Sequence, residues 1–249
     1  MNPKSWNFKI YLGVAYIIVL SLGLYFLFTT FDLSNLTSYD FIRENRDLIL
    51  RYKENNIFFL TIIFFIITVL LNLLLCPMLL PTLVIGFILG KWLGTIILVF
   101  GNTLGGVLLY LLAKTFFSEL IREKFATKFS KFIEFFNKNE MVYFMFFRFI
   151  GGGGTPFPIQ NVLPVIFNMS IKNYIAATFL GIIPTTFVTV ALGSGIENII
   201  DQNAELNFLS VFLSPEIYLP IIGFFTLFEF PLAGIIARIL GEFISQILL

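Results

Sequence analysis

The residue best suited to chemistry is a lone cation in a long apolar stretch. Arg148 is the only charged residue in the segment 141–171. A charge at the centre of a bilayer costs about 2.5–3.5 kcal/mol even on the most lenient scale, so such a side chain faces a cavity, a partner or a lipid headgroup. A guanidinium binds phosphate through a planar fork of N–H donors. We therefore expect Arg148 to bind phosphate; the alternative is an interfacial arginine whose side chain extends to the headgroups.

A second candidate is an acid within an apolar stretch near the C-terminus. Glu229 lies in LFEFPLAG, followed closely by Pro231. A carboxylate at membrane depth needs a cation beside it, and otherwise it takes up a proton. We expect Glu229 to pair with Arg148 or to act as a protonatable group. The alternative is a neutral glutamic acid that is hydrogen-bonded within helix packing.

The segment GGGGTPFPIQN follows Arg148 almost directly. Backbone N–H groups of a glycine-rich turn can hold an anion, but no Lys-Ser/Thr follows as a nucleotide-binding loop requires. We interpret the glycines as a bare-backbone approach for a headgroup, or simply as residues that permit a tight turn. Asn161 either donates to headgroup oxygens or satisfies nearby carbonyls. The predicted substrate-binding set is Arg148, Gly151, Gly152, Gly153, Gly154, Pro156, Pro158, Asn161, Pro77, Pro81 and Glu229.

Several classes of chemistry are excluded or disfavoured by what the chain lacks. It has no histidine, and Cys76 is its single cysteine, so histidine-based catalysis, internal disulfides and most catalytic zinc sites are excluded. No HExxH or G-x-S-x-G motif occurs. The net charge of +1 argues against a nucleic-acid partner. We expect no enzyme activity, no metal and no cofactor.

The composition is that of an integral membrane protein. Residues of the hydrophobic class make up 58% of the 249-residue chain and charged residues 12%, against about 25% charged in soluble domains. A spanning helix needs about 20 apolar residues, and the first long apolar run lacks a cleavage site, which indicates an anchor. We predict an all-α polytopic fold with about five transmembrane helices, at 10–28, 57–76, 92–113, 174–196 and 217–240.

Two further apolar stretches are too short and too rich in proline and glycine to cross. They lie at about 77–91 and about 148–171. Freed backbone groups are tolerated at membrane depth only inside protein or beside a cavity, so we predict two re-entrant hairpins. Pro77 precedes Gly101 by nearly the same number of positions as Pro156 precedes Gly181, which indicates an inverted repeat with opposed hairpins. Further glycines recur at four-residue spacing and predict close helix packing at Gly86, Gly90, Gly94, Gly101 and Gly105.

These elements give three predicted regions. Residues 1–56 form an N-terminal anchor helix and a surface loop, in which 41–56 read as an amphipathic helix. Residues 57–197 hold both hairpins, joined by an amphipathic interface helix at 114–140. Residues 198–249 form a loop and the last transmembrane helix.

Residues 72–110 and 141–197 resemble the DedA superfamily, specifically its VTT-domain branch of SNARE-associated Golgi proteins. The resemblance is carried by both hairpins and by a set of positions at Arg148, Pro156, Asn161, Tyr174, Gly181, Pro184 and Gly193. It implies lipid handling, because family members act as phospholipid scramblases or as translocases of phosphate-bearing carrier lipids. Two departures concern proton coupling: residues 55–90 contain no acid, and glycines occupy the region where a second arginine is expected. We do not expect proton coupling of that kind.

The function we predict is movement of a phospholipid or phosphate-bearing lipid between leaflets, with membrane lipids as partners. A small-solute or ion secondary transporter, with or without proton coupling, is the first alternative, and a non-transporting membrane scaffold is the second. The composition is compatible with a bacterial inner membrane and with a homo-oligomer. An enclosed polar cavity favours the solute transporter, and a groove open to lipid favours the lipid transporter.

Overall fold

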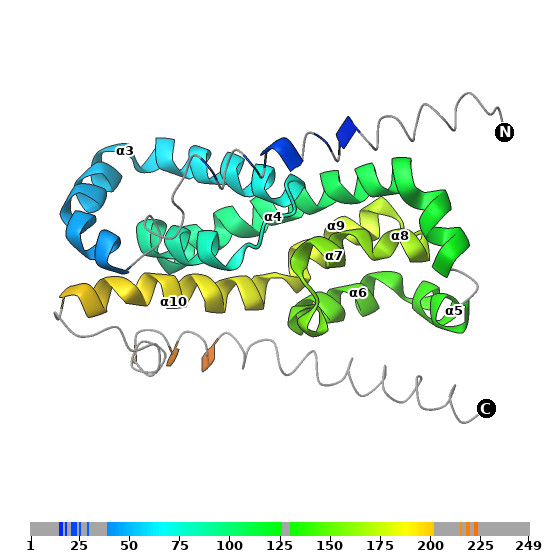
Figure 1. Cartoon of the computed structure of the whole chain (residues 1–249). Helices are drawn as coiled ribbons and strands as arrows, with labels where there is room; N and C mark the ends of the chain where they lie inside the picture. Colours follow the sequence, from blue (N-terminus) through cyan, green and yellow to red (C-terminus); the bar gives the residue numbers. More distant parts are fainter. Residues whose placement is uncertain are drawn as a thin grey trace. The chain divides into compact units, whose positions relative to one another are not determined.

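The computed structural model describes residues 39–125 and 130–201, with single positions between 15 and 29 and between 215 and 223. All regular elements in the described residues are helices, which confirms the all-α prediction (Figure 1). Only single positions of the predicted spans at 10–28 and 217–240 are described, so both spans stay predictions, and Glu229 lies outside the described residues. The chain divides into two compact units, and the first ends at Ser194. Its helices are α3 (Tyr39–Leu73), α4 (Leu79–Phe125), α5 (Ser130–Lys138), α6 (Glu140–Phe149), η1 (Gly151–Gly154), α7 (Phe157–Val162), α8 (Pro164–Phe167), α9 (Ile171–Gly181) and the start of α10 (Ile183–Asp201).

Three of the predicted transmembrane helices are confirmed. Among the described residues, three helical stretches are long and apolar enough to cross a membrane: Arg51–Leu73, Leu79–Phe116 and Ile171–Ile196. The predicted surface helix at 41–56 is the first part of α3, which is interrupted at Asn56 by non-helical dihedral angles. The surface helix and the following span thus form one interrupted helix.

The first predicted hairpin contains a sharp turn at Gly90. This glycine, within α4, has φ 76° and ψ 171°, and open space surrounds the position that a Cβ would occupy. A Cβ at Gly94 would lie 3.4 Å from the carbonyl oxygen of Ile85, so the chain folds back beside itself there. The expectation that Gly90 serves helix packing is therefore wrong, because its backbone makes the turn. The second part of α4 runs on to Phe125, into the region predicted as a separate interface helix.

The same order of elements occurs twice along the chain. A helix, a proline-containing loop, a short helix, a residue with left-handed backbone and a long helical stretch follow one another from α3 to α4. They follow again from α6 to α10, with α7 and α8 as the short helix. The left-handed residues are Gly90 (φ 76°) and Asn168 (φ 52°). The elements thus recur in the order of the predicted repeat, and the inverted orientation of its two halves stays a prediction.

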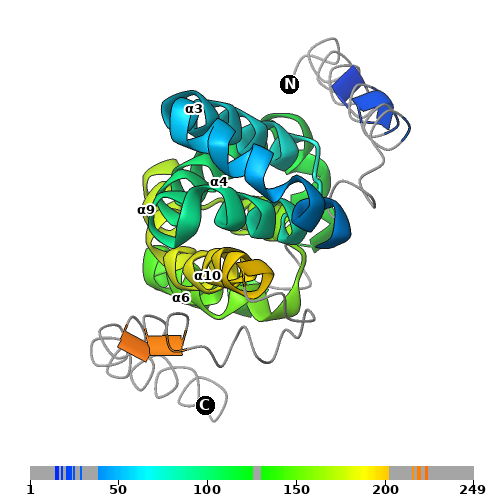
Figure 2. The same ribbon diagram turned by 90° about the vertical axis from the view of Figure 1, so that its left-hand side faces the viewer.

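Small residues let the helices approach closely. Figure 2 shows α3 lying against α4, and α6 likewise packs directly against α9. Aromatic rings of α4 contact rings of the stretch from α9 into α10. As the residue number increases along α4, the number of its partner decreases, so these long helices run antiparallel. The pairs are Trp92 with Phe187, Phe100 with Phe179 and Tyr110 with Tyr174. At Gly86, an added Cβ would overlap the carbonyl oxygen of Val190.

Candidate functional site

Arg148 is buried inside the protein. It lies in the last turn of α6, and only 1% of its surface is exposed. The backbone of α9 approaches it closely, because Gly181 has no side chain. A Cβ at Gly181 would lie 2.6 Å from the Cβ of Arg148 and 2.6 Å from the carbonyl oxygen of Met145. The position of Arg148 between α6 and α9 therefore requires a glycine at residue 181.

Three neutral side chains receive the guanidinium. Nη1 donates to Oε1 of Gln160 at 3.1 Å, and Nη2 donates to the hydroxyl of Tyr174 at 3.2 Å and to Oδ1 of Asn161. The buried Nε donor has no hydrogen-bond partner in the part of the chain that the structure describes. An arginine is charged at any physiological pH, and these partners leave its charge uncancelled. The predicted partner Glu229 lies outside the described residues.

Aromatic rings surround the same guanidinium. Its Cζ lies 4.7 Å from the ring centroid of Phe157, 4.8 Å from that of Phe144 and 5.9 Å from that of Tyr174. The negative face of each ring attracts a cation, an effect worth about 2 kcal/mol or more where water is excluded. The rings stabilise the buried cation and hold its plane, but they supply no counter-charge.

The four-glycine run forms a turn with left-handed backbone, and this turn positions Gln160, one of the hydrogen-bond partners of Arg148. Gly151–Gly154 have φ values of 71°, 69°, 60° and 81°. The amide of Gln160 lies against Gly152, where an added Cβ would overlap it. Its Nε2 donates to the carbonyl oxygens of Gly151 at 3.2 Å and Thr155 at 2.7 Å, while its Oε1 accepts from Arg148. The turn therefore fixes the amide orientation that Arg148 requires.

Asn161 reaches Arg148 from the following helix turn. Its Oδ1 accepts from Arg148 and from the hydroxyl of Tyr174, the latter at 3.1 Å. Gly106 of α4 faces this pair, and a Cβ there would lie 3.0 Å from Oδ1 of Asn161 and 3.1 Å from the hydroxyl of Tyr174. The arginine is thus held by α6, α7 and α9, with α4 closing the far side.

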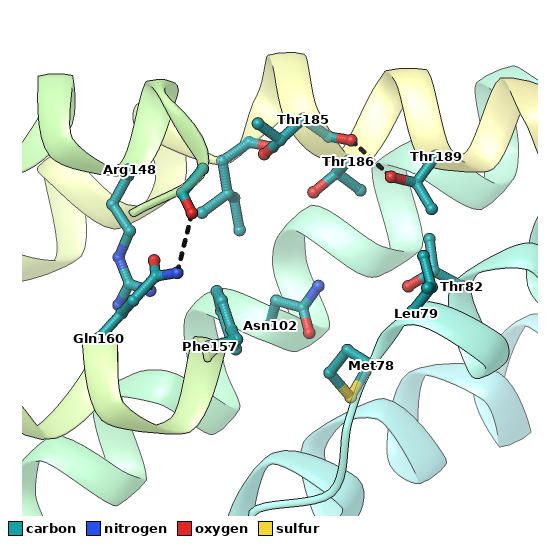
Figure 3. A pocket seen from close by; sticks show the side chains of 12 residues that line it. Met78, Leu79, Thr82, Asn102, Arg148, Phe157, Gln160, Thr185, Thr186 and Thr189 are labelled. Carbon is teal, nitrogen blue, oxygen red and sulfur yellow. Dashed lines mark hydrogen bonds between the residues drawn. The ribbon is translucent and has the colours of Figure 1, made fainter. Parts of the chain in front are cut away.

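A cavity of about 330 Å³ opens beside Arg148 (Figure 3). Arg148 and Gln160 lie at one end, and the side chains of four threonines and an asparagine line the rest together with apolar groups. None of the described residues that line it is acidic. They are Met78, Leu79, Thr82, Asn102, Arg148, Gly151, Phe157, Gln160, Ile182, Thr185, Thr186 and Thr189.

The structure brings together some of the predicted site residues and not others. Arg148 and Gly151 line the cavity, Asn161 binds Arg148, and Gly152 seats Gln160. The others among the described residues do not line it; they are Gly153, Gly154, Pro156, Pro158, Pro77 and Pro81.

The residues that sequence reasoning missed are mostly uncharged polar groups. Gln160 had the same signal as its neighbour Asn161, a polar side chain in an apolar hairpin. Asn102 is likewise a polar residue inside a predicted span. The cavity threonines have no such signal, because threonine hydroxyls bond readily to their own helix and occur throughout apolar helices. The four are Thr82, Thr185, Thr186 and Thr189.

Comparison with known proteins identifies one family. Residues 76–195 match the family model of the VTT domain. The matched range includes both parts of the chain that were expected to form hairpins, and every described cavity residue lies within it. No curated protein and no solved structure matches the chain.

Proposed function

We propose that this chain, which carries over residues 76–195 the VTT domain of the DedA and SNARE-associated Golgi protein family, moves a phosphate-bearing lipid between the leaflets of a membrane. Arg148 receives the phosphate of the headgroup in the cavity, and the acyl chains stay in the surrounding lipid. The gradient of the lipid itself drives the movement.

One observation carries this proposal: a buried guanidinium beside a cavity, whose partners among the described residues are all neutral and whose Nε has no hydrogen-bond partner among them. Leaving a charge uncompensated at low dielectric is costly, so such a group gains most from binding an anion. A phosphate oxygen suits it, because a charge-assisted hydrogen bond from a guanidinium is about twice as strong as a neutral one. The anion that meets this requirement inside a membrane is a lipid phosphate.

The short helices are the elements that bring a headgroup to this depth. The stretch Phe157–Phe167 is apolar and helical but has too few residues to cross. At 1.5 Å per residue it spans about 16 Å, roughly half of a hydrocarbon core of about 30 Å. We assign it, and the arm from Leu79 to Gly90, as two opposed re-entrant segments of an inverted repeat. Their polar ends line the cavity from opposite halves of the domain.

The proposed transport needs no proton. The described cavity lining contains no acidic residue, and residues 55–90 contain none. A bacterial inner membrane is the location we propose, on composition alone. The described lining holds no histidine, cysteine, lysine or carboxylate that could activate its threonine hydroxyls, so we propose binding and passage without covalent chemistry.

Leaflet exchange in liposomes tests the proposal. Fluorescent phospholipids are placed in both leaflets, and dithionite then quenches those in the outer leaflet. We expect fast exchange with the intact protein, and exchange about tenfold slower with Arg148→Ala, because one charge-assisted contact is worth about 1.5–3 kcal/mol. Arg148→Lys should lie between the two, since lysine keeps the charge but not the fork.

The matched control is Lys172→Ala, which removes an exposed cation from α9. Its exchange rate should equal that of the intact protein. Exchange no faster than in protein-free vesicles would contradict the proposal and direct the search to small solutes. Equal rates for Arg148→Ala and the intact protein would remove Arg148 from the path.

A further inference from the structure

The cavity has a second polar wall that Arg148 does not explain. Figure 3 shows Thr82 and Thr189 at the side away from Arg148, with Asn102 between. The hydroxyls of Thr82 and Thr186 make no side-chain hydrogen bond to the described residues. Thr185 and Thr189 donate to the carbonyl oxygens of Ile182 and Thr185 at 3.2 and 3.0 Å, so their lone pairs remain available. This wall offers hydroxyl donors and acceptors, and no charge.

A neighbouring asparagine fixes how Asn102 faces the cavity. Nδ2 of Asn72 donates to the carbonyl oxygen of Thr68 at 2.9 Å, and a carbonyl accepts only from the nitrogen of the amide. The same Nδ2 donates to Oδ1 of Asn102 at 2.8 Å. Oδ1 of Asn102 is thereby occupied, and its NH₂ group is left to face the cavity. Asn102 is thus a neutral donor held in one orientation, and Asn72 is its positioning residue.

The charges in the cavity discriminate between headgroups. Arg148 is the only charged side chain among the described residues that line it. A headgroup with net negative charge neutralises the site, whereas a zwitterion leaves one positive charge in a region of low dielectric. An ammonium group finds no carboxylate here. The ring of Phe157, which would attract a quaternary ammonium, already faces the guanidinium at 4.7 Å.

We propose, on the basis of the function proposed above, that the cavity selects lipids with an anionic, hydroxyl-bearing headgroup over zwitterionic ones. The phosphate binds Arg148, and the hydroxylated portion binds Asn102 and the threonine wall. Phosphatidylglycerol has this chemistry, and phosphatidylcholine lacks both of its features. Asn102 is the specificity-determining donor.

Exchange of three labelled lipids that differ only in headgroup tests this selectivity. Phosphatidylglycerol, phosphatidylethanolamine and phosphatidylcholine carry the same acyl label in vesicles of one composition. We expect phosphatidylglycerol to exchange about tenfold faster than phosphatidylcholine, corresponding to one good polar contact. Uptake of soluble glycerol 3-phosphate into the same vesicles is the parallel arm; uptake without lipid exchange would show that the ligand is a solute and overturn the proposal.

Variants of the neutral wall separate selectivity from passage. Asn102→Leu should lower the phosphatidylglycerol rate to about that of phosphatidylcholine, while Asn102→Asp should raise phosphatidylethanolamine relative to phosphatidylglycerol. Thr186→Val is a second test, because this substitution removes one cavity hydroxyl with little change of side-chain shape. The matched control is Thr103→Val, since Thr103 is buried on α4 but does not line the cavity. Its headgroup preference should be unchanged.

Two results would overturn the inference in distinguishable ways. If the intact protein exchanges all three lipids at equal rates and Arg148→Ala is still slow, the proposed lipid transport stands and the proposed selectivity is wrong. Exchange no faster than in protein-free vesicles would remove the proposed function and the inference together. If Asn102→Leu and Thr186→Val both keep the full preference for phosphatidylglycerol, then the neutral wall does not determine headgroup selectivity.

Discussion

The glycine turn beside Arg148 offers a test with an internal control. Gly152 and Gly154 both have left-handed backbone, with φ values of 69° and 81°. A Cβ at Gly152 would overlap the amide of Gln160, whereas nothing lies within 4 Å of a Cβ at Gly154. Alanine at either position meets a backbone penalty for its positive φ. Only alanine at Gly152 also displaces the side chain that accepts from Arg148.

The expected magnitudes follow from that difference. A non-glycine residue in left-handed conformation costs about 1–2 kcal/mol, which is the whole effect for Gly154→Ala. Gly152→Ala adds the lost hydrogen bond between Gln160 and the buried charge, about 1.5–3 kcal/mol. We therefore expect Gly152→Ala to lower the free energy of unfolding by about 3–5 kcal/mol.

Titration with dodecyl sulfate in mixed micelles measures both variants, with helix content followed by circular dichroism. Lipid exchange measured in parallel should fall for Gly152→Ala and stay near the intact rate for Gly154→Ala. Equal destabilisation of the two variants would refute the reasoning, because it would mean that Gln160 does not depend on the turn to reach Arg148.

Three further predictions rest on separate contacts. Gly193→Ala would place a Cβ against the carbonyl oxygen of Leu83, and we expect a loss of about 1–3 kcal/mol in the same titration from overpacking; an unchanged midpoint would mean that the two helices separate freely. Glu140 accepts from the backbone N–H of Ser170 at 3.1 Å at the start of α9, so Glu140→Ala should cost about 0.5–2 kcal/mol while Glu140→Gln, which keeps an acceptor, costs less. Arg148→Met should slow exchange about as much as Arg148→Ala and lower the free energy of unfolding by about 1–3 kcal/mol, because the buried acceptors of Gln160 and Asn161 lose their donor; an unchanged free energy of unfolding would show that these acceptors do not depend on Arg148.

Much of the architecture was open to prediction from residue type alone. The uncharged runs gave three spans that the structure confirms, because the length of an apolar helix is set by the bilayer. The prolines and glycines marked where regular helices are interrupted, and the turns at Gly90 and Gly151–Gly154 lie in those segments. Charge in an apolar segment singled out Arg148 for the same reason of solvation cost.

Other features depend on contacts that no local pattern contains. The role of Gly90 as a turn was missed, because four-residue glycine spacing is also the pattern of close helix packing. Asn102 is held in place by Asn72, a partner on another helix, and nothing in the spacing of the two residues shows that their amides meet. The cavity threonines of α10, Thr185, Thr186 and Thr189, have the ordinary spacing of residues on one helix face, so their sequence positions do not mark them as cavity residues. Only the packing of α4, α7 and α10 around one cavity distinguishes them.

The central claim is that a lipid phosphate binds Arg148 inside the protein. Solid-state NMR measures this contact directly, through dipolar dephasing of ¹⁵N-labelled arginine side chains by lipid ³¹P in vesicles that contain phosphatidylglycerol. We expect the intact protein to show a strongly dephased guanidinium signal that disappears in Arg148→Lys, while signals from the other arginines remain. Identical dephasing in the two proteins would place every phosphate contact elsewhere and contradict the account.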